Sequence, residues 1–249
     1  IFYRLNSFEF AKISGDILGN LYERFLDIDK RKKLGEYYTP FYVARYILDR
    51  IGFYDNPAPL LDPACGSGTF LIAAAVGLIE RLVSKGVKLD VAMKQAVDLI
   101  HGLDINMFAA FIAQLQLIWH LLPYLKQSNM KELPEFKVYG GTNSLVYLDQ
   151  NTLLGSGLFG AVLDLPIEAS VRVRDSKFHY VVGNPPYIRN ERLKDTGSWR
   201  ENYEDVDFRN SDIAYFFVAR AIQGRDGSMP PWLEDGGRMC FVLPMGLCD

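Results

Sequence analysis

One stretch of the sequence joins the pattern of a short strand to that of a long helix: Leu60-Leu61-Asp62-Pro63-Ala64-Cys65-Gly66-Ser67-Gly68-Thr69-Phe70. Residues 60–62 form an apolar run that ends on an acid, and residues 69–84 are apolar over a length typical of a buried helix. Gly66 and Gly68 lack a Cβ, so the backbone can turn tightly and a ligand can approach its N–H groups. The stretch therefore predicts an α/β unit with a ligand site at the N-terminus of the helix.

The residues of this glycine turn also limit which ligand it can hold. The turn matches neither the GxxxxGK[ST] phosphate loop nor the GxGxxG dinucleotide fingerprint. No lysine directly follows Gly68 to hold phosphates, which argues against a nucleoside triphosphatase. A helix N-terminus still suits a carboxylate or another polar ligand. The alternative is a tight strand–helix connection that binds nothing.

Strand and helix patterns alternate along the rest of the chain. Further strands are predicted at residues 102–105, 137–139, 161–165, 179–182 and 239–243, and further helices at 40–51, 90–100, 106–122 and 211–223. Such alternation is typical of an α/β fold with a doubly wound, mostly parallel sheet. Apolar residues at helical spacing predict an N-terminal helical segment over residues 1–34, ahead of the main domain over residues 35–249.

Composition excludes several classes of protein. Of the 249 residues, 49% are apolar and 23% charged, which favours a globular chain over a disordered one. The net charge of −3 argues against a general cationic nucleic-acid binder, so any such contact must come from local patches. Three cysteines without a CxxC pair fit a reducing cytosol.

The membrane is not an expected partner. The most apolar stretch, residues 108–125, is interrupted by Gln114, Gln116, His120 and Pro123, so no apolar run is expected to reach the roughly 18 residues that span a bilayer. The expectation is a soluble, cytoplasmic protein.

Asp104 ends the strand predicted after the glycine turn. In doubly wound folds an acid at this place accepts hydrogen bonds from ribose hydroxyls. Asp104 lies further from Asp62 than the spacing of about 20 residues in dinucleotide-binding folds, because a helix is predicted over residues 90–100. An acid at a strand end is common, so this signal alone is weak.

Asn184-Pro185-Pro186-Tyr187 directly follows another predicted strand. Each proline fixes φ and lacks an N–H, and a residue before proline is pushed toward extended geometry. The segment is therefore a stiff arm that presents the Asn184 side-chain oxygen, the Pro185 carbonyl and the Tyr187 ring. Two acceptors beside an aromatic face match a planar group that carries an NH2. A Pro-Pro turn without chemistry is the alternative.

Taken together, the glycine turn, the strand-end acid and Asn-Pro-Pro-Tyr resemble the amino-methyltransferases that use S-adenosylmethionine. Upstream, Gly35-Glu36-Tyr37-Tyr38-Thr39-Pro40 resembles the first motif of the gamma-order N6-adenine DNA methyltransferases. Those enzymes occur as type I modification subunits and as fused type II restriction-modification enzymes. The resemblance extends over about residues 14–246, and implies the Rossmann-like fold of that class.

The resemblance also implies roles for individual residues. The residues implied to hold S-adenosylmethionine are Tyr38, Thr39, Pro40, Asp62, Ala64, Gly66, Ser67, Gly68, Asp104, Ile105 and Asn143. The implied catalytic residues are Asn184, Pro185, Pro186 and Tyr187. Asn143 stands where relatives often have an Asp facing the adenine of the cofactor. No metal ligands are expected, since His101, His120 and His179 are scattered along the chain.

The implied activity is methyl transfer to N6 of a flipped-out adenine at a specific sequence in double-stranded DNA, within a restriction-modification system. In such a system a specificity or restriction subunit, or a fused domain, is expected outside these residues. The catalytic domain at residues 35–249 is expected to be C-terminally incomplete. The same tetrapeptide occurs in protein-glutamine and ribosomal RNA amino-methyltransferases, the main alternative; a non-catalytic scaffold is another. Residues 37–40, Tyr-Tyr-Thr-Pro, favour DNA, and the intact tetrapeptide argues against a scaffold.

Overall fold

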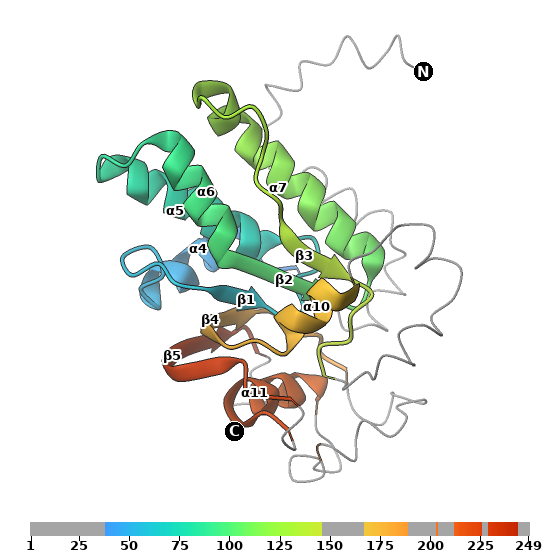
Figure 1. Cartoon of the computed structure of the whole chain (residues 1–249). Coiled ribbons are helices and arrows are strands. Elements are labelled where there is room, and N and C mark those ends of the chain that lie inside the picture. The colour runs from blue at the N-terminus through green and yellow to red at the C-terminus, as the bar shows by residue number, and fades with distance from the viewer. Residues whose placement is uncertain (1–37, 146–166, 189–202, 204–211, 226–228, 244–249) are drawn as a thin grey trace, which may run out of the picture.

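A five-stranded sheet forms the centre of the computed structural model, which describes residues 38–145, 167–188, 203, 212–225 and 229–243 (Figure 1). The strands are β1 (Leu60–Asp62), β2 (Ile100–Asp104), β3 (Lys137–Gly140), β4 (Phe178–Gly183) and β5 (Leu233–Phe241). The helices are α4 (Phe41–Arg50), α5 (Thr69–Ser84), α6 (Leu89–Leu99), α7 (Met107–Gln127), α10 (Ile167–Arg174) and α11 (Ile213–Gln223). The N-terminal segment predicted at residues 1–34 lies outside the described residues.

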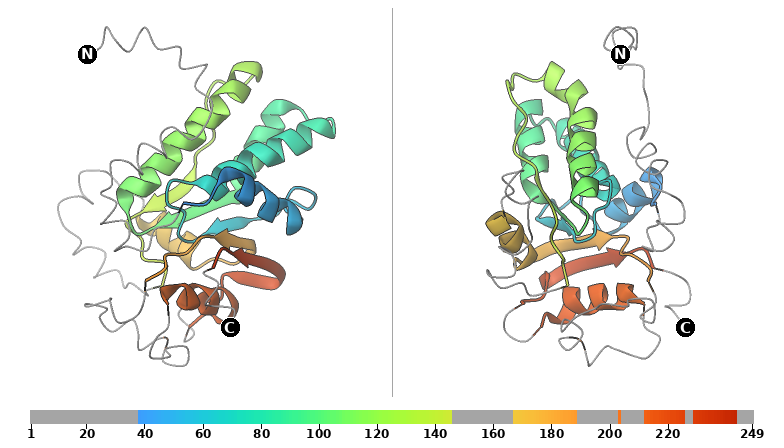
Figure 2. Two further views of the ribbon diagram at one scale, coloured as in Figure 1. Left: turned by 180° about the vertical axis from the view of Figure 1, so that it is seen from behind. Right: turned by 90° about the vertical axis from the view of Figure 1, so that its right-hand side faces the viewer.

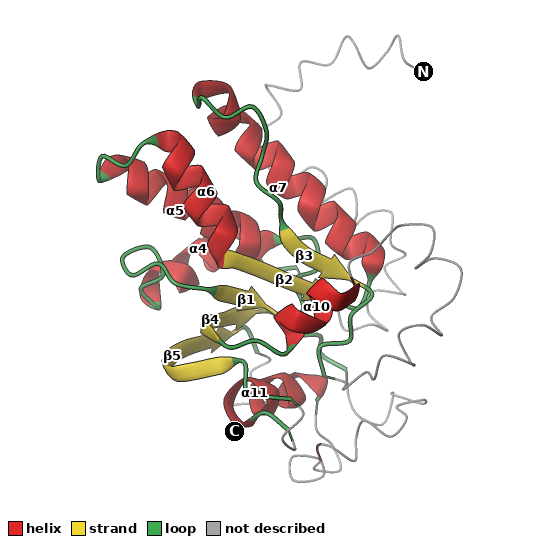
Figure 3. Cartoon of the chain, viewed as in Figure 1, coloured by secondary structure: helices red, strands yellow, loops and turns green. Residues whose placement is uncertain are grey.

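The strand order explains where a ligand site can form. The order is β3-β2-β1-β4-β5, and every neighbouring pair is parallel. The chain winds outward from β1 through β2 to β3 and then crosses to the other side of β1 to form β4 and β5 (Figures 1 and 3). This confirms the predicted doubly wound α/β fold and puts its switch point between β1 and β4.

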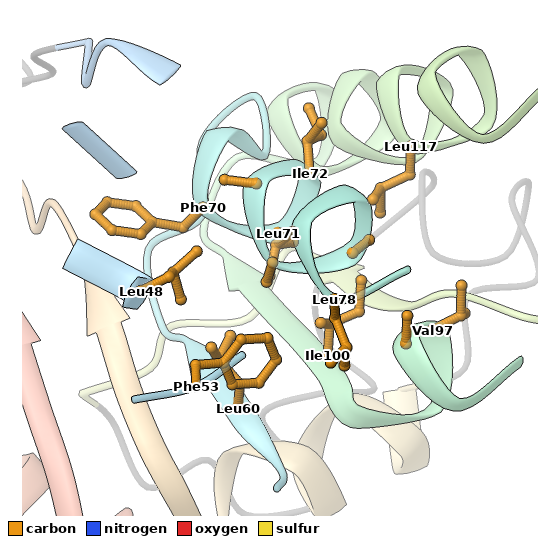
Figure 4. Packing of buried hydrophobic residues seen from close by; sticks show 14 of the residues in the cluster. Leu48, Phe53, Leu60, Phe70, Leu71, Ile72, Leu78, Val97, Ile100 and Leu117 are labelled. Carbon is orange, nitrogen blue, oxygen red and sulfur yellow. The ribbon is translucent and has the colours of Figure 1, made fainter. Parts of the chain in front are cut away.

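Alternating residues of the strands belong to two separate hydrophobic cores, because successive side chains in a strand point to opposite faces of the sheet. Leu60 and Tyr180 join the cluster formed with α4, α5, α6 and α7, whereas Leu61 and Val181 join the cluster formed with α10 and α11. Figure 2 shows α7 and α11 on opposite sides of the sheet. In the larger core, Figure 4 shows Leu48, Phe53, Leu71, Leu78, Val97 and Leu117 gathered around Leu60 and Ile100.

Helix α7 corrects one expectation. Among the described residues it is the helix long and apolar enough to cross a membrane, so the expectation that no apolar run reaches that length is wrong for this helix. It nevertheless lies in the larger core through Ala113, Leu117 and Leu121. The polar residues within it bond inside the fold: Gln114 Nε2 donates to the Val138 carbonyl at 2.7 Å. Here α7 is a core helix of the fold.

Several element boundaries differ from the expected ones. Helix α7 continues beyond Pro123, because the Ser128 amide closes the last turn on the Tyr124 carbonyl at 2.9 Å and Tyr124 packs against the core. Strand β5 begins six residues earlier than expected, at Leu233, and α10 was not predicted. The strand predicted at residues 161–165 lies outside the described residues.

Candidate active site

The glycine turn connects β1 to α5, and its two glycines serve different purposes. Both have positive φ, +51° at Gly66 and +91° at Gly68. A Cβ on Gly68 would come within 2.9 Å of the Ala113 Cβ and 3.2 Å of the Ala113 Cα, so this glycine lets the turn pack directly on α7. A Cβ on Gly66 would meet nothing within 4 Å. Gly66 therefore faces open space that a ligand can occupy.

Two side chains that the sequence did not reveal hold this turn in place. Ser144 Oγ donates to the Pro63 carbonyl at 2.6 Å, and Gln116 Nε2 donates to the Ser67 carbonyl at 3.0 Å. Both side chains are buried. They come from the segment after β3 and from α7, far away along the chain, and nothing in their local sequence marks them. Their bonds fix the ends of the turn before any ligand arrives.

Asp104 fixes the middle of the same turn. Its Oδ2 accepts from the Gly66 amide at 2.8 Å, and its Oδ1 accepts from the Asn106 amide at 2.7 Å. Burial raises the pKa of Asp104, and these two amide hydrogen bonds oppose the rise. A carboxylate has about four acceptor sites, so Asp104 can hold the turn and still accept from a ligand hydroxyl.

Asp62 is the second acid of the site and, unlike the half-buried Asp104, it is buried. Its side chain is 2% exposed, and its Oδ1 accepts from the Ala64 amide at 3.2 Å. Burial raises the pKa of Asp62 to about 8, and the negative charge of Asp104 adds to the rise. Two desolvated carboxyl groups so close together favour a cationic ligand, which would supply the missing opposite charge.

The raised pKa of Asp62 gives the ligand-free protein a defined pH dependence. The folded pKa of about 8 exceeds the unfolded value of about 4, so the folded protein binds the extra proton between these values. Protonation of Asp62 therefore contributes to the free energy of unfolding, and we expect this contribution to be complete below pH 4. Between pH 4 and pH 8 it should fall with rising pH by up to about 1.4 kcal/mol per pH unit. Asp62→Asn should remove the decline.

Urea unfolding of both ligand-free proteins at pH 5, 6, 7 and 8 measures this difference. The asparagine oxygen can still accept from the Ala64 amide, so the substitution removes the titration and keeps that bond. Parallel stability curves for wild type and Asp62→Asn would contradict the assignment.

Asn184, Pro185, Pro186 and Tyr187 form a loop at the end of β4 that is anchored on both sides. Pro185 is buried and the other three residues are half-buried. The Val242 amide, just after β5, donates to the Gly183 carbonyl at 2.9 Å. On the far side, the Ile213 amide at the start of α11 donates to the Ile188 carbonyl at 3.0 Å. The loop is thus held between β5 and α11, which makes a stiff platform.

Within this loop the Tyr187 hydroxyl joins two groups. It lies 2.9 Å from the Val242 carbonyl oxygen and also forms a short hydrogen-bond contact with Oδ1 of Asn184. The sequence predicted an aromatic face at Tyr187 but gave no sign that its hydroxyl reaches β5.

The glycine turn and the Asn184 loop meet because β1 and β4 are neighbours, with Leu61 paired to Val181. At the ends of these strands, a Cβ on Gly183 would lie only 2.7 Å from Oδ1 of Asp62. The residue before Asn184 therefore packs directly on the acid that begins the glycine turn. This is the switch point of the sheet, where open α/β folds bind their ligands.

Comparison with known sequences gives this site a family. The sequence profile of the family described as N-6 DNA Methylase matches residues 13–247. The chain belongs to this family.

The relatives of this chain are longer proteins. Over 219 residues it is 32% identical to the adenine-specific methyltransferase PglX of Streptomyces coelicolor, covering 75% of this chain and 17% of that one. Over 195 residues it is 25% identical to the type II methyltransferase M.BstVI of Geobacillus stearothermophilus, covering 76% and 31%. The chain thus spans less than a third of either relative.

Solved structures share the fold of this chain. The cryo-EM structure of the DrdV–DNA complex aligns with a TM-score of 0.53 at 22% identity, covering 84% of this chain and 22% of that one. A nuclease-deletion mutant of the type ISP restriction-modification enzyme LlaGI, in complex with a DNA substrate mimic, aligns with a TM-score of 0.57 at 15% identity, covering 81% and 18%.

Helix α7 contacts both the glycine turn and the first residue of α4. Phe41, the first residue of α4, stacks on His120 with ring centroids 6.3 Å apart. His120 lies one helical turn beyond Gln116, whose side chain holds Ser67. Residues 38–40, which the resemblance assigns to the cofactor, directly precede Phe41 in the chain. Their cofactor role remains a prediction.

The residues expected near the adenine of the cofactor follow β2 and β3. Ile105 is 68% exposed, directly after Asp104. The Thr142 amide donates to the Asp104 carbonyl at 3.2 Å, which holds the segment after β3 against β2. Oδ1 of Asn143 accepts from its own neighbour, the Leu145 amide, at 3.0 Å. The contacts of Ile105 and Asn143 with the adenine of the cofactor remain predictions. The side-chain oxygen of Asn143 already accepts a hydrogen bond within its own turn.

Within the ranges that the structure describes, no group of three His, Cys, Asp or Glu side chains could hold a metal ion.

Proposed function

We propose that this chain is the catalytic domain of an S-adenosylmethionine-dependent methyltransferase that acts on N6 of an adenine flipped out of double-stranded DNA. The observation that carries the proposal is the packing of Gly183 against Asp62, which joins the glycine turn to the loop of Asn184. Membership of the N-6 DNA methylase family supports the reaction, and the relative PglX is named an adenine-specific methyltransferase.

The residues around the glycine turn fit S-adenosylmethionine. Gly66 faces open space, and the desolvated carboxyl groups of the buried Asp62 and the half-buried Asp104 suit a ligand with a net positive charge. Asp104 would bind the ribose hydroxyls, and Ile105 would lie against the adenine. The remaining residues proposed to hold the cofactor are Tyr38, Thr39, Pro40, Ala64, Ser67, Gly68 and Asn143. When bound, the cofactor supplies an electrophilic methyl group on a sulfonium.

Asn184 and Pro185 would activate the acceptor. The lone pair of the adenine N6 amine is delocalised into the ring, which makes the amine a weak nucleophile. The Asn184 side-chain oxygen and the Pro185 carbonyl would accept its two hydrogens and stabilise the positive charge that develops on the nitrogen. Such fixed acceptors stabilise developing positive charge in the way that an oxyanion hole stabilises developing negative charge. Pro186 keeps the arm stiff, since its ring fixes φ.

Tyr187 would receive the base. Taking an adenine out of the duplex costs a few kcal/mol, and stacking on an aromatic ring returns about 1–3 kcal/mol. The Tyr187 ring is held at the site by the contacts of its hydroxyl with Val242 and Asn184.

The same proposal includes the biological setting. The relative M.BstVI is named a type II methyltransferase. The structural neighbour LlaGI is named a restriction-modification enzyme, and DrdV was solved as a complex with DNA. We place this chain in a restriction-modification system, with a specificity or restriction subunit, or a fused domain, outside these 249 residues.

The test offers the full-length protein three acceptors together with S-adenosylmethionine: methyl-free DNA, ribosomal RNA and a protein release factor. Each acceptor is then digested and analysed for methylated products by mass spectrometry. We expect N6-methyladenine in the DNA alone. Methyl groups on glutamine or RNA, or no transfer to any acceptor, would contradict the proposal.

A further inference from the structure

The Tyr187 hydroxyl closes a ring of contacts around the loop of Asn184. The Val242 amide donates to the Gly183 carbonyl at 2.9 Å, and the Val242 carbonyl lies 2.9 Å from the Tyr187 hydroxyl. The same hydroxyl contacts the side-chain amide of Asn184. Val242, the residue directly after β5, thus holds the loop on both sides: through Gly183 before Asn184 and through Tyr187 after Pro186.

Counting protons decides which way these bonds run. A phenol hydroxyl carries one proton, and a backbone carbonyl can only accept. Both groups that the hydroxyl reaches are acceptors, the Val242 carbonyl and Oδ1 of Asn184, so the single proton of Tyr187 is shared between them. The hydroxyl therefore holds the oxygen side of the Asn184 amide. An amide oxygen has two lone pairs, so Oδ1 can accept from the hydroxyl and from one further donor.

We propose that the Tyr187 hydroxyl is a positioning group for Asn184: held beside the Val242 carbonyl, it donates to the Asn184 side-chain oxygen and so fixes that oxygen in place for the acceptor amine. The inference rests on the proposed function, because it assigns the orientation that function needs. An amide turned the other way would set its own N–H groups against the N–H groups of the amine. This role is separate from stacking, which uses the tyrosine ring.

Tyr187→Phe tests the hydroxyl alone, since it keeps the ring. In the full-length protein, with DNA and S-adenosylmethionine both saturating, we expect the single-turnover rate of methyl transfer to fall about five- to twentyfold, as for the loss of one hydrogen bond and its orienting effect. We expect the dissociation constants for S-adenosylmethionine and for DNA to stay within about twofold of wild type.

Two further variants separate positioning from a general loss of packing. Tyr54→Phe is the matched control, because it removes a buried hydroxyl that donates to the Ala73 carbonyl at 2.9 Å, away from the site. It should lower the melting temperature and leave the transfer rate unchanged. In the Asn184→Ala background, Tyr187→Phe should change the rate less than about twofold, since the group it orients is gone.

The outcomes distinguish this role from the proposed function. An active wild type with an equally active Tyr187→Phe variant would overturn the positioning role and leave the function standing. The same holds if the two substitutions lower the rate independently in the double variant. A wild type that transfers no methyl group to DNA would overturn the function and this role together.

Discussion

Replacing Asn184 by alanine is expected to lower the rate of methyl transfer about 100-fold or more while S-adenosylmethionine binding stays within about twofold of wild type. A hydrogen bond to a charged group contributes roughly 1.5–3 kcal/mol, and each 1.36 kcal/mol of lost transition-state stabilisation is about tenfold in rate. The loss falls on the rate because the positive charge on the amine develops only as the methyl group is transferred. Single-turnover kinetics on unmethylated DNA measure it.

Asn56→Ala provides the matched control for this substitution. Asn56 is exposed in the turn before β1, at the opposite end of that strand from the site, so its loss should leave the rate unchanged. Retained activity in Asn184→Ala would contradict the acceptor role. A variant that no longer binds S-adenosylmethionine would instead assign Asn184 to the cofactor.

The second large effect separates the two glycines of the turn. Gly68→Ala is expected to lower the free energy of unfolding by about 2–5 kcal/mol, because an alanine is strained at positive φ and its Cβ would overlap Ala113. Gly66→Ala should cost only about 1 kcal/mol of stability, since its Cβ meets nothing within 4 Å. It should instead weaken S-adenosylmethionine binding tenfold or more, because the methyl group enters the space proposed for the cofactor.

Gly86→Ala is the control for both variants. Gly86 follows α5, has φ of +86° and would also place its Cβ in open space. It shares the backbone strain of Gly66 and Gly68 but lies at the other end of α5 from the turn. Urea unfolding and equilibrium binding of S-adenosylmethionine measure the three variants side by side. Equal cofactor binding by Gly66→Ala and Gly86→Ala would show that the open space at Gly66 is not the cofactor site.

Short-range patterns predicted much of the fold. The apolar run before Asp62, the two glycines and the long apolar helix after them each depend on neighbours along the chain, and β1, the turn and α5 were found where expected. The ends of elements were less predictable. Helix α7 runs beyond Pro123 because Tyr124 packs against the core, and the local rule that proline ends a helix contains no such contact.

The site shows the same division. Asp104 was predicted from its place at a strand end, Asn184 from the tetrapeptide that follows a strand, and Asp62 from the resemblance. The structure places the three at one edge of the sheet, because β1, β2 and β4 are parallel neighbours. The side chains that hold the glycine turn in place were not predicted. Ser144 and Gln116 act through single hydrogen bonds to backbone carbonyls, and a serine or glutamine makes such bonds anywhere.

The sequence by itself therefore determined the class of fold and the chemical groups at the strand ends, since these follow from local backbone preferences and from the alternation of apolar residues. Only the tertiary structure decided that Gly183 packs on Asp62 and that the Tyr187 hydroxyl reaches Val242. Both contacts depend on the order of β1, β4 and β5 in the sheet. Strand order is set by the burial of two whole faces of the sheet, which no single segment of the chain encodes.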